Sequence, residues 1–245
     1  MIKQELETYK KITHYDLEQL ELDYLQNIML KIIYSKFTKI YFKGGTCLQK
    51  CYGIKRFSED LDFNHQEKNV HEIITYIKNY FPYEFSIKEH KQTAFGDTFI
   101  LKIKGILYSG HIQSTCKLIL DFRKGDIHKK GNVKKITPLY KDIPRYQIVM
   151  LDITEIFAEK IRAIMTRFKA RDIFDLYQLA QMNVNTDIEL INKKLETYNK
   201  TFTLAELEEK IEEKRSIYEE EISLLTQEYP SFETCKENIL RYVQE

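Results

Sequence analysis

Two neighbouring stretches decide how this chain folds: Phe42-Lys43-Gly44-Gly45-Thr46 and Arg56-Phe57-Ser58-Glu59-Asp60-Leu61-Asp62-Phe63. The glycine pair stands between an expected strand and an expected helix, where free N–H groups and the helix dipole favour a phosphate group. Asp60 and Asp62 lie on a second expected strand, and strand alternation puts them on one face of it. Two carboxylates on one face suit divalent cations that bridge nucleotide phosphates. The pattern predicts a metal-dependent enzyme that acts on a nucleoside triphosphate.

A third carboxylate, Asp121, completes the predicted metal site. It belongs to an expected strand at 114–123, in which Leu118, Leu120 and Phe122 share one face and Asp121 takes the other. Sites that transfer phosphoryl or nucleotidyl groups with two metal ions commonly use such an additional ligand. The expected chemistry is in-line attack on an α-phosphate.

Each of these features also has a simpler interpretation. A glycine pair is a generic turn, and the phosphate-binding pattern GxxxxGK[ST] is absent. Asp60 and Asp62 would be ordinary polar residues if they lay on the exposed face of an edge strand. The flanking Leu61 and Phe63 favour instead a strand that is docked on the core.

A second group of charged residues follows the expected boundary near residue 150. Lys160 projects from a largely apolar helical stripe, where a lysine either reaches solvent or binds an anion. Asp172 and Asp175 lie one turn apart beside another apolar stripe, which is typical of an ion pair or a ligand site. The alternative is a structural ion pair between two packed helices, Lys160–Asp172 or Arg171–Asp175.

The composition describes an ordinary globular protein, with 43% hydrophobic and 31% charged residues. We expect no membrane segment and no signal peptide, and the four cysteines show no zinc spacing, so we expect a reduced cytoplasmic location. The six histidines also show no metal-binding spacing and are scattered along the chain: His14, His65, His71, His90, His111 and His128.

The net charge of +1 conceals an asymmetry between the two parts of the chain. Residues 1–149 carry 25 Lys+Arg against 17 Asp+Glu, whereas residues 150–245 carry 13 against 20. Eight of the basic residues fall between Arg123 and Arg145. This stretch fits contact with a nucleic acid, and it fits equally a solvated hairpin that lysines keep soluble.

Periodicity predicts an α+β fold with two domains. Helices are expected at 16–35, 46–52 and 70–81, and strands at 39–42, 60–64, 83–91, 97–108, 114–123, 136–139 and 147–150. Later helices are expected at 153–167, 171–182, 186–198, 203–226 and 230–243. We therefore expect an α/β domain with an N-terminal helix over residues 1–150 and a helical domain that completes the cleft over 151–245.

Taken together, these motifs resemble the nucleotidyltransferase superfamily with the polymerase-β-like palm, a mixed sheet with flanking helices. The chain is more closely similar to the AbiEii/AbiGii-type toxins of abortive-infection and type IV toxin–antitoxin systems. Four blocks carry this resemblance in the expected order: Lys43-Gly44-Gly45-Thr46-x-Leu48, Arg56-x-Ser58-x-Asp60-x-Asp62-Phe63, Glu159-Lys160-x-x-Ala163 and Ala170-Arg171-Asp172-x-x-Asp175-Leu176.

The resemblance implies a toxin that transfers a nucleotide from an NTP to an acceptor, with tRNA as the acceptor in some members. It implies Mg²⁺ or Mn²⁺ as the cofactor and a cognate antitoxin as a possible partner. The residues implied as catalytic are Asp60, Asp62, Lys160 and Asp172, and the metal ligands are Asp60, Asp62 and Asp121. The nucleotide would contact Lys43, Gly44, Gly45, Thr46, Ser58 and Arg171.

Two other functions fit the same fold. One is a nucleotidyltransferase that modifies a small molecule such as an antibiotic, although such a substrate needs no extended basic surface. The other is a non-catalytic module that binds RNA or a protein partner. Such a module would have lost its catalytic residues, whereas this sequence retains Asp60, Asp62, Lys160 and Asp172.

Overall fold

The structure is a computed structural model that describes residues 1–67 and 69–244. The chain forms two compact units. The first contains Met1–Cys51, Glu59–Gly125 and Gly131–Met150, and the second contains Tyr52–Ser58, Asp126–Lys130 and the chain from Leu151 onward. Two short segments from the first part of the sequence thus group with the helical part. The expected α+β class, with a mixed sheet and flanking helices, is confirmed.

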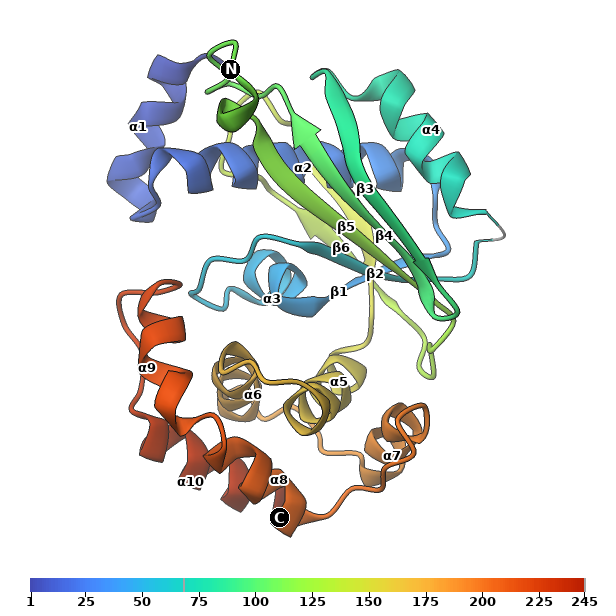
Figure 1. The fold of residues 1–245 in the computed structure, drawn as a ribbon, viewed down its shortest axis with the longest axis vertical. Coiled ribbons are helices and arrows are strands. Elements are labelled where there is room, and N and C mark those ends of the chain that lie inside the picture. Colours follow the sequence, from blue (N-terminus) through green and yellow to red (C-terminus); the bar gives the residue numbers. More distant parts are fainter. Residues whose placement is uncertain (68, 245) are drawn as a thin grey trace. The chain divides into compact units, whose positions relative to one another are not determined.

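The first unit is built on a seven-stranded sheet in the order β3-β4-β5-β2-β1-β7-β6 (Figure 1). Its strands are β1 (Ile40–Lys43), β2 (Leu61–His65), β3 (Phe85–Thr93), β4 (Gly96–Ile103), β5 (Cys116–Lys124), β6 (Asn132–Ile136) and β7 (Tyr146–Met150). Its helices are α1 (Lys3–Thr13), α2 (Leu17–Lys36), α3 (Gly44–Tyr52) and α4 (Val70–Tyr80), with a short 3-10 turn, η1, at Ile112–Ser114.

The central strands bring the sequence motifs together. Strand β1 pairs with β2 in antiparallel fashion, and β2 pairs with β5 in parallel fashion. One face of these strands is aromatic, because Phe63 stacks on Phe122 at 5.0 Å between ring centroids and also lies 5.5 Å from Phe42. Helices α2 and α4 contact each other beside this apolar face (Figure 1). Burial of these rings fixes the register, since a shift by one residue would turn them outward.

The second unit consists mainly of helices: α5 (Ile153–Thr166), α6 (Arg171–Gln181), α7 (Ile188–Glu196), α8 (Leu204–Glu212), α9 (Arg215–Ser223) and α10 (Phe232–Gln244). Helix α5 contacts α6, α7 and α8, so it forms the centre of this unit. Its sequence places apolar residues at helical spacing, and Ile156, Phe157, Ile161 and Ile164 are all buried. None of the helices in the described part of the chain combines the length and apolarity needed to span a bilayer.

Segment 126–130 is attached to the second unit by a buried carboxylate. The side chain of Glu155 accepts hydrogen bonds from the backbone N–H groups of His128 and Lys129, each at 2.9 Å. The ammonium of Lys194 lies 2.7 Å from Glu155 and 3.0 Å from Asp126, and Lys194 is buried. These bonds satisfy buried polar groups that would otherwise be costly to desolvate.

Two expected elements differ from the structure. The predicted helix at 203–226 is wrong as a single helix, because α8 and α9 are separate. At the break the buried Lys214 ammonium donates to the carbonyls of Ile164 and Lys210 at 2.8 and 2.7 Å, which holds the chain in a non-helical turn. The predicted strand at 136–139 is also displaced, since β6 ends at Ile136. Pro138 lacks the N–H that a continued ladder needs.

Helix α1 is an element that the sequence analysis did not predict. It buries a single side chain, Leu6. Tyr9 provides a further contact, with its ring 5.0 Å from that of Tyr140. Helix α1 is therefore held by packing against the rest of the first unit, which local periodicity does not reveal.

Candidate functional site

Two of the predicted metal ligands, Asp62 and Asp121, lie on the face of the sheet that does not carry the aromatic residues. Asp62 and Asp121 are direct register partners on the parallel strands β2 and β5, so their side chains leave the same face. Asp60 comes directly before β2, and the alternation of the chain assigns it to this face as well. Thr98, the register partner of Asp121 on β4, donates its hydroxyl to Asp121 at 2.6 Å.

Gly44 gives Asp62 its place beside the start of α3. Gly44 has a φ of +72°, and a Cβ built there would overlap the Asp62 carboxylate oxygen and come within 2.9 Å of its Cγ. Any residue larger than glycine would both strain this left-handed backbone and displace the carboxylate. Lys43, the register partner of Asp62 on β1, is also buried. Gly44 therefore allows the Asp62 carboxylate to approach the backbone closely, and it also begins the helix.

Thr46 connects α3 to the carboxylate strand. Its side chain is fully buried, and its hydroxyl donates a hydrogen bond to the backbone carbonyl of Asp60. The hydroxyl therefore fixes the backbone where the chain enters β2. A role of Thr46 in contacting a nucleotide stays a prediction, and its observed bond is a positioning one.

The first-unit carboxylates fit a hard divalent cation by their chemistry. Carboxylate oxygens are the ligands that Mg²⁺ and Mn²⁺ prefer. Asp121 is oriented by Thr98 and by Arg123, whose Nε lies 3.4 Å from its Oδ2. Among the described residues, one group of three potential metal ligands has ligand atoms that all lie within 4.8 Å of one another. That group is His71, His90 and Asp97 and not the three aspartates.

The second group of predicted residues forms a buried ionic network in the second unit. The Lys160 ammonium lies 2.9 Å from Asp172 and 2.7 Å from Asp175. Arg167 donates two further bonds to Asp172, each of 2.7 Å. Both aspartates are fully buried. The Lys160–Asp172 ion pair, which we considered from the spacing of these residues, is thus present. Asp175 binds Lys160 and a second cationic residue, which belongs to the sequence stretch 56–63.

That residue is Arg56, which spacing alone did not connect to Asp175. Its guanidinium donates to both carboxylate oxygens of Asp175 at 2.6 and 2.7 Å and to the carbonyl of Phe57 at 3.0 Å. The N–H of Phe57 in turn donates to the carbonyl of Leu225 at 2.9 Å. A bidentate pair of this kind is strong and directional. It fixes segment 52–58, which leads directly into the carboxylate strand. One sequence signal could have suggested this pairing. Arg56 and Asp175 each precede an apolar residue, Phe57 and Leu176, which indicates that both charged residues lie close to the core.

Neighbouring charged groups determine the ionisation state of the two buried aspartates. Burial opposes ionisation of Asp172, but the charges and hydrogen bonds of Lys160 and Arg167 outweigh it and hold the pKa of Asp172 far below its usual value. Burial likewise opposes ionisation of Asp175, and Arg56 and Lys160 outweigh it, so the pKa of Asp175 is also lowered. The two aspartates are therefore charged, and they neutralise cations that would otherwise be costly to bury.

Two further predicted residues, Ser58 and Arg171, belong to the second unit. Ser58 is buried at the end of segment 52–58. Arg171 begins α6, where its guanidinium lies 4.0 Å from Glu221. Within the first unit the structure brings together Lys43, Gly44, Asp62 and Asp121. Within the second it brings together Lys160 and Asp172.

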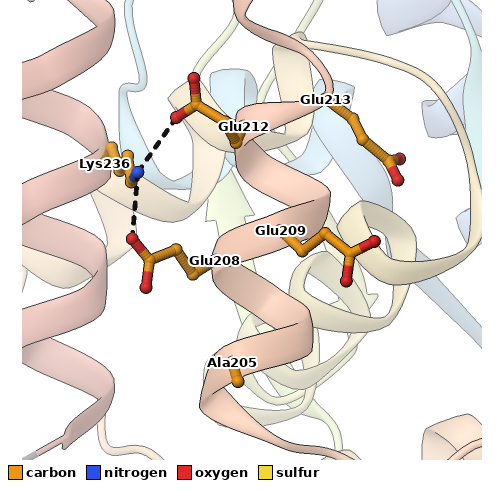
Figure 2. Close-up of a pocket in the computed structure, with 6 residues that line it drawn as sticks. All are labelled: Ala205, Glu208, Glu209, Glu212, Glu213 and Lys236. Carbon is orange, nitrogen blue, oxygen red and sulfur yellow. Dashed lines mark hydrogen bonds and ion pairs between the residues drawn. The ribbon is translucent and has the colours of Figure 1, made fainter.

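Two surface hollows differ in charge. One, in the first unit, is lined by Lys31, Tyr34, Ser35, Lys135, Arg145, Tyr146 and Gln147. The other lies between α8 and α10 in the second unit and is acidic (Figure 2). There Lys236 bridges Glu208 and Glu212, each at 3.0 Å, while Glu209 and Glu213 line the same hollow. Neither hollow contains a predicted catalytic residue, and the acidic one would repel a polyphosphate.

Comparisons with known proteins show a family and a fold for the chain. The family model described as "Nucleotidyl transferase AbiEii toxin, Type IV TA system" matches residues 30–238. Two solved structures share the fold. MenT4, a nucleotidyltransferase toxin from Mycobacterium tuberculosis H37Rv, has a TM-score of 0.72 and 16% identity, covering 99% of this chain and 88% of its own. JHP933 from Helicobacter pylori has a TM-score of 0.63 and 21% identity, covering 93% and 90%. No curated protein sequence matches the chain.

Proposed function

The chain belongs to the AbiEii family of nucleotidyltransferase toxins from type IV toxin–antitoxin systems, and on this basis we propose that it transfers a nucleotide from an NTP to tRNA. The observation that carries this proposal is the pairing of Asp62 with Asp121 on neighbouring parallel strands, beside the glycine turn that opens α3. Carboxylates next to a phosphate-binding helix start are the parts that nucleotidyl transfer requires.

The nucleotide is proposed to bind at the start of α3. The N–H groups of Gly44 and Gly45 are among those left without helical partners, and the positive end of the helix dipole favours the triphosphate. Lys43 adds a positive charge at the end of β1. We also propose that Ser58 and Arg171 contact the nucleotide. The support for these two contacts comes from the family motifs and not from the positions of the residues.

Mg²⁺ or Mn²⁺ is the proposed cofactor, with Asp60, Asp62 and Asp121 as its ligands. The bound cation supplies charge neutralisation for the phosphate oxygens. Thr46 holds the backbone of Asp60, Gly44 leaves room for Asp62, and Thr98 orients Asp121. The acceptor hydroxyl attacks the α-phosphorus and its proton passes to solvent water, so one P–O bond forms while the bond to pyrophosphate breaks and pyrophosphate leaves.

An RNA acceptor is supported by the basic hollow of the first unit. Lys135 and Arg145 come from the basic stretch identified in the sequence, and Lys31 from α2 adds a third charge. Clustered cations of this kind bind a phosphate backbone and release its counterions. A compact small-molecule acceptor would need no such surface. The proposed substrates imply action in the cytoplasm, and the family implies a cognate antitoxin.

The direct experiment incubates the purified protein with each of four α-³²P-labelled NTPs, Mg²⁺ and total tRNA. Label that appears in the tRNA band with one NTP supports the proposal. Parallel reactions replace tRNA by aminoglycosides or omit Mg²⁺. Label on a small molecule, or none on tRNA at any NTP, would overturn the tRNA assignment, and transfer that persists without divalent cation would overturn the metal assignment.

A further inference from the structure

A compact group of three potential metal ligands lies at the β3–β4 side of the first unit, away from the aspartates discussed above. His71 comes from the first turn of α4, His90 from β3 and Asp97 from β4. One ligand atom of each residue lies within 4.8 Å of the others. Three separate elements thus converge on one point, although no two of these residues show metal-binding spacing in the sequence.

The two imidazoles are held in place by a buried aromatic ring. His90 stacks on Phe99 with parallel rings 4.3 Å apart, and His71 meets the edge of Phe99 at 5.9 Å. Phe99 itself is almost completely buried. The rings of His71 and His90 lie 5.1 Å apart at 89° to each other. Packing therefore orients both rings, which lowers the entropic cost of binding an ion.

The carboxylate of Asp97 completes the group. Its Oδ1 lies 2.7 Å from Nε2 of His90, and its side chain is 13% exposed while that of His90 is 29% exposed. A simple His90–Asp97 pair would explain this contact alone. It would not explain why His71, from a different element, brings a third ligand atom to the same place.

The group lies on the opposite face of the sheet from the predicted catalytic carboxylates. Thr98 points towards Asp121, with which it forms a hydrogen bond. The alternation of β4 therefore directs Asp97 and Phe99 to the other face, where α4 packs. Binding here would be independent of the ions that serve nucleotidyl transfer.

We propose that His71, His90 and Asp97 form a binding site for a transition-metal ion of the Zn²⁺ type. Two imidazoles and one carboxylate suit Zn²⁺, Co²⁺ or Ni²⁺, whereas Mg²⁺ prefers oxygen ligands alone. Three protein ligands leave a fourth position for water. The ion would join the start of α4 to the β3–β4 hairpin at the edge of the sheet and would stabilise the first unit by mass action.

The test uses the full-length protein without a histidine tag, freed of metal by chelation, and titrates it with ZnCl₂ by calorimetry. We expect one equivalent to bind, with the affinity reduced about tenfold or more in His71→Ala and in His90→Ala. His111→Ala removes an exposed histidine outside the group and serves as the matched control. Circular dichroism of each metal-free variant checks that it folds.

A second measurement needs no variant. Diethylpyrocarbonate modifies accessible imidazoles, so bound Zn²⁺ should protect His71 and His90 in the wild-type protein while His111 still reacts. Cobalt should produce the intense visible absorption of a four-coordinate ion. Absence of Zn²⁺ binding, or binding that neither protects these two histidines nor depends on them, would overturn the proposal.

Discussion

The carboxylate of Asp62 lies against the Cα of Gly44, so closely that glycine is the one residue whose lack of a side chain leaves it room. Gly44 directly follows the end of β1, where Lys43 is the register partner of Asp62 on β2. The glycine turn and the carboxylate strand are therefore one structural feature. It follows that changes at Gly44 should act on the function of Asp62.

Gly44→Ala tests this relationship. A methyl group there would displace the Asp62 carboxylate, and misplacement by about 1 Å can cost on the order of 100-fold in rate. We expect a loss of nucleotidyl transfer of that order, measured as kcat/KM. Gly53→Ala is the matched control, since its φ of +73° imposes the same backbone strain with no atom within 4 Å of the new Cβ. Equal losses in both variants would attribute the effect to strain alone.

Arg56→Met tests the buried ionic network of the second unit. The change leaves Asp175 bound to Lys160 but without the bidentate guanidinium, in a fully buried site. Removing one partner of a buried ion pair typically costs about 3–5 kcal/mol. We expect a loss of this size in the free energy of urea unfolding. Lys193→Met, which breaks an exposed pair with Glu189, should change the free energy of unfolding far less, because solvent screens that pair. A similarly small effect for Arg56→Met would contradict the structural role of the network.

The same network predicts how stability depends on pH. The pKa values of Asp172 and Asp175 are lowered in the folded protein, while an unfolded aspartate titrates near pH 3.9. Their contribution is therefore complete above about pH 5 and is lost as the pH falls towards the folded values, because the unfolded state takes up protons first. Urea unfolding measured from pH 6 to pH 3 should show stability falling on acidification. Asp175→Asn should be less stable at pH 6 but show a shallower decline, and an equally steep one would refute this assignment.

Lys160→Met separates a nucleotide contact from a purely structural role. The resemblance assigns Lys160 to the triphosphate, and the structure shows it paired with Asp172 and Asp175. Loss of a charged hydrogen bond to substrate should raise the KM for NTP about tenfold or more. Arg167→Met removes the other cation beside Asp172 and is the control. We expect both variants to lose stability but the KM to rise in Lys160→Met alone. Equal KM values in the two variants would leave Lys160 with a structural role only.

Local sequence patterns were sufficient for the elements that depend on neighbours in the chain. Strand alternation put Asp62 and Asp121 on the face opposite their aromatic neighbours, and apolar periodicity found α5 and α6. The contacts that depend on distant residues were not accessible in this way. Arg56 and Asp175 are 119 residues apart, and their pairing follows from tertiary packing.

Contacts between distant residues also explain two other features that the sequence did not predict. These are the break between α8 and α9 and the group of His71, His90 and Asp97. The ammonium of Lys214 ends the helical run by binding the carbonyl of Ile164, 50 residues away. The two histidines converge only because α4 packs against the strand that carries Phe99. Neither arrangement has a period or a spacing that one sequence can reveal.

The most direct test of the proposed function is label transfer from α-³²P-NTP to tRNA by Asp62→Asn. Asparagine keeps the size of the side chain and removes the charge that would bind a cation. Glu84→Gln, at an exposed position paired with Lys104, is the control. We expect transfer by the wild-type protein and by Glu84→Gln, and none by a folded Asp62→Asn. Undiminished transfer by Asp62→Asn would contradict the assignment of this strand to catalysis.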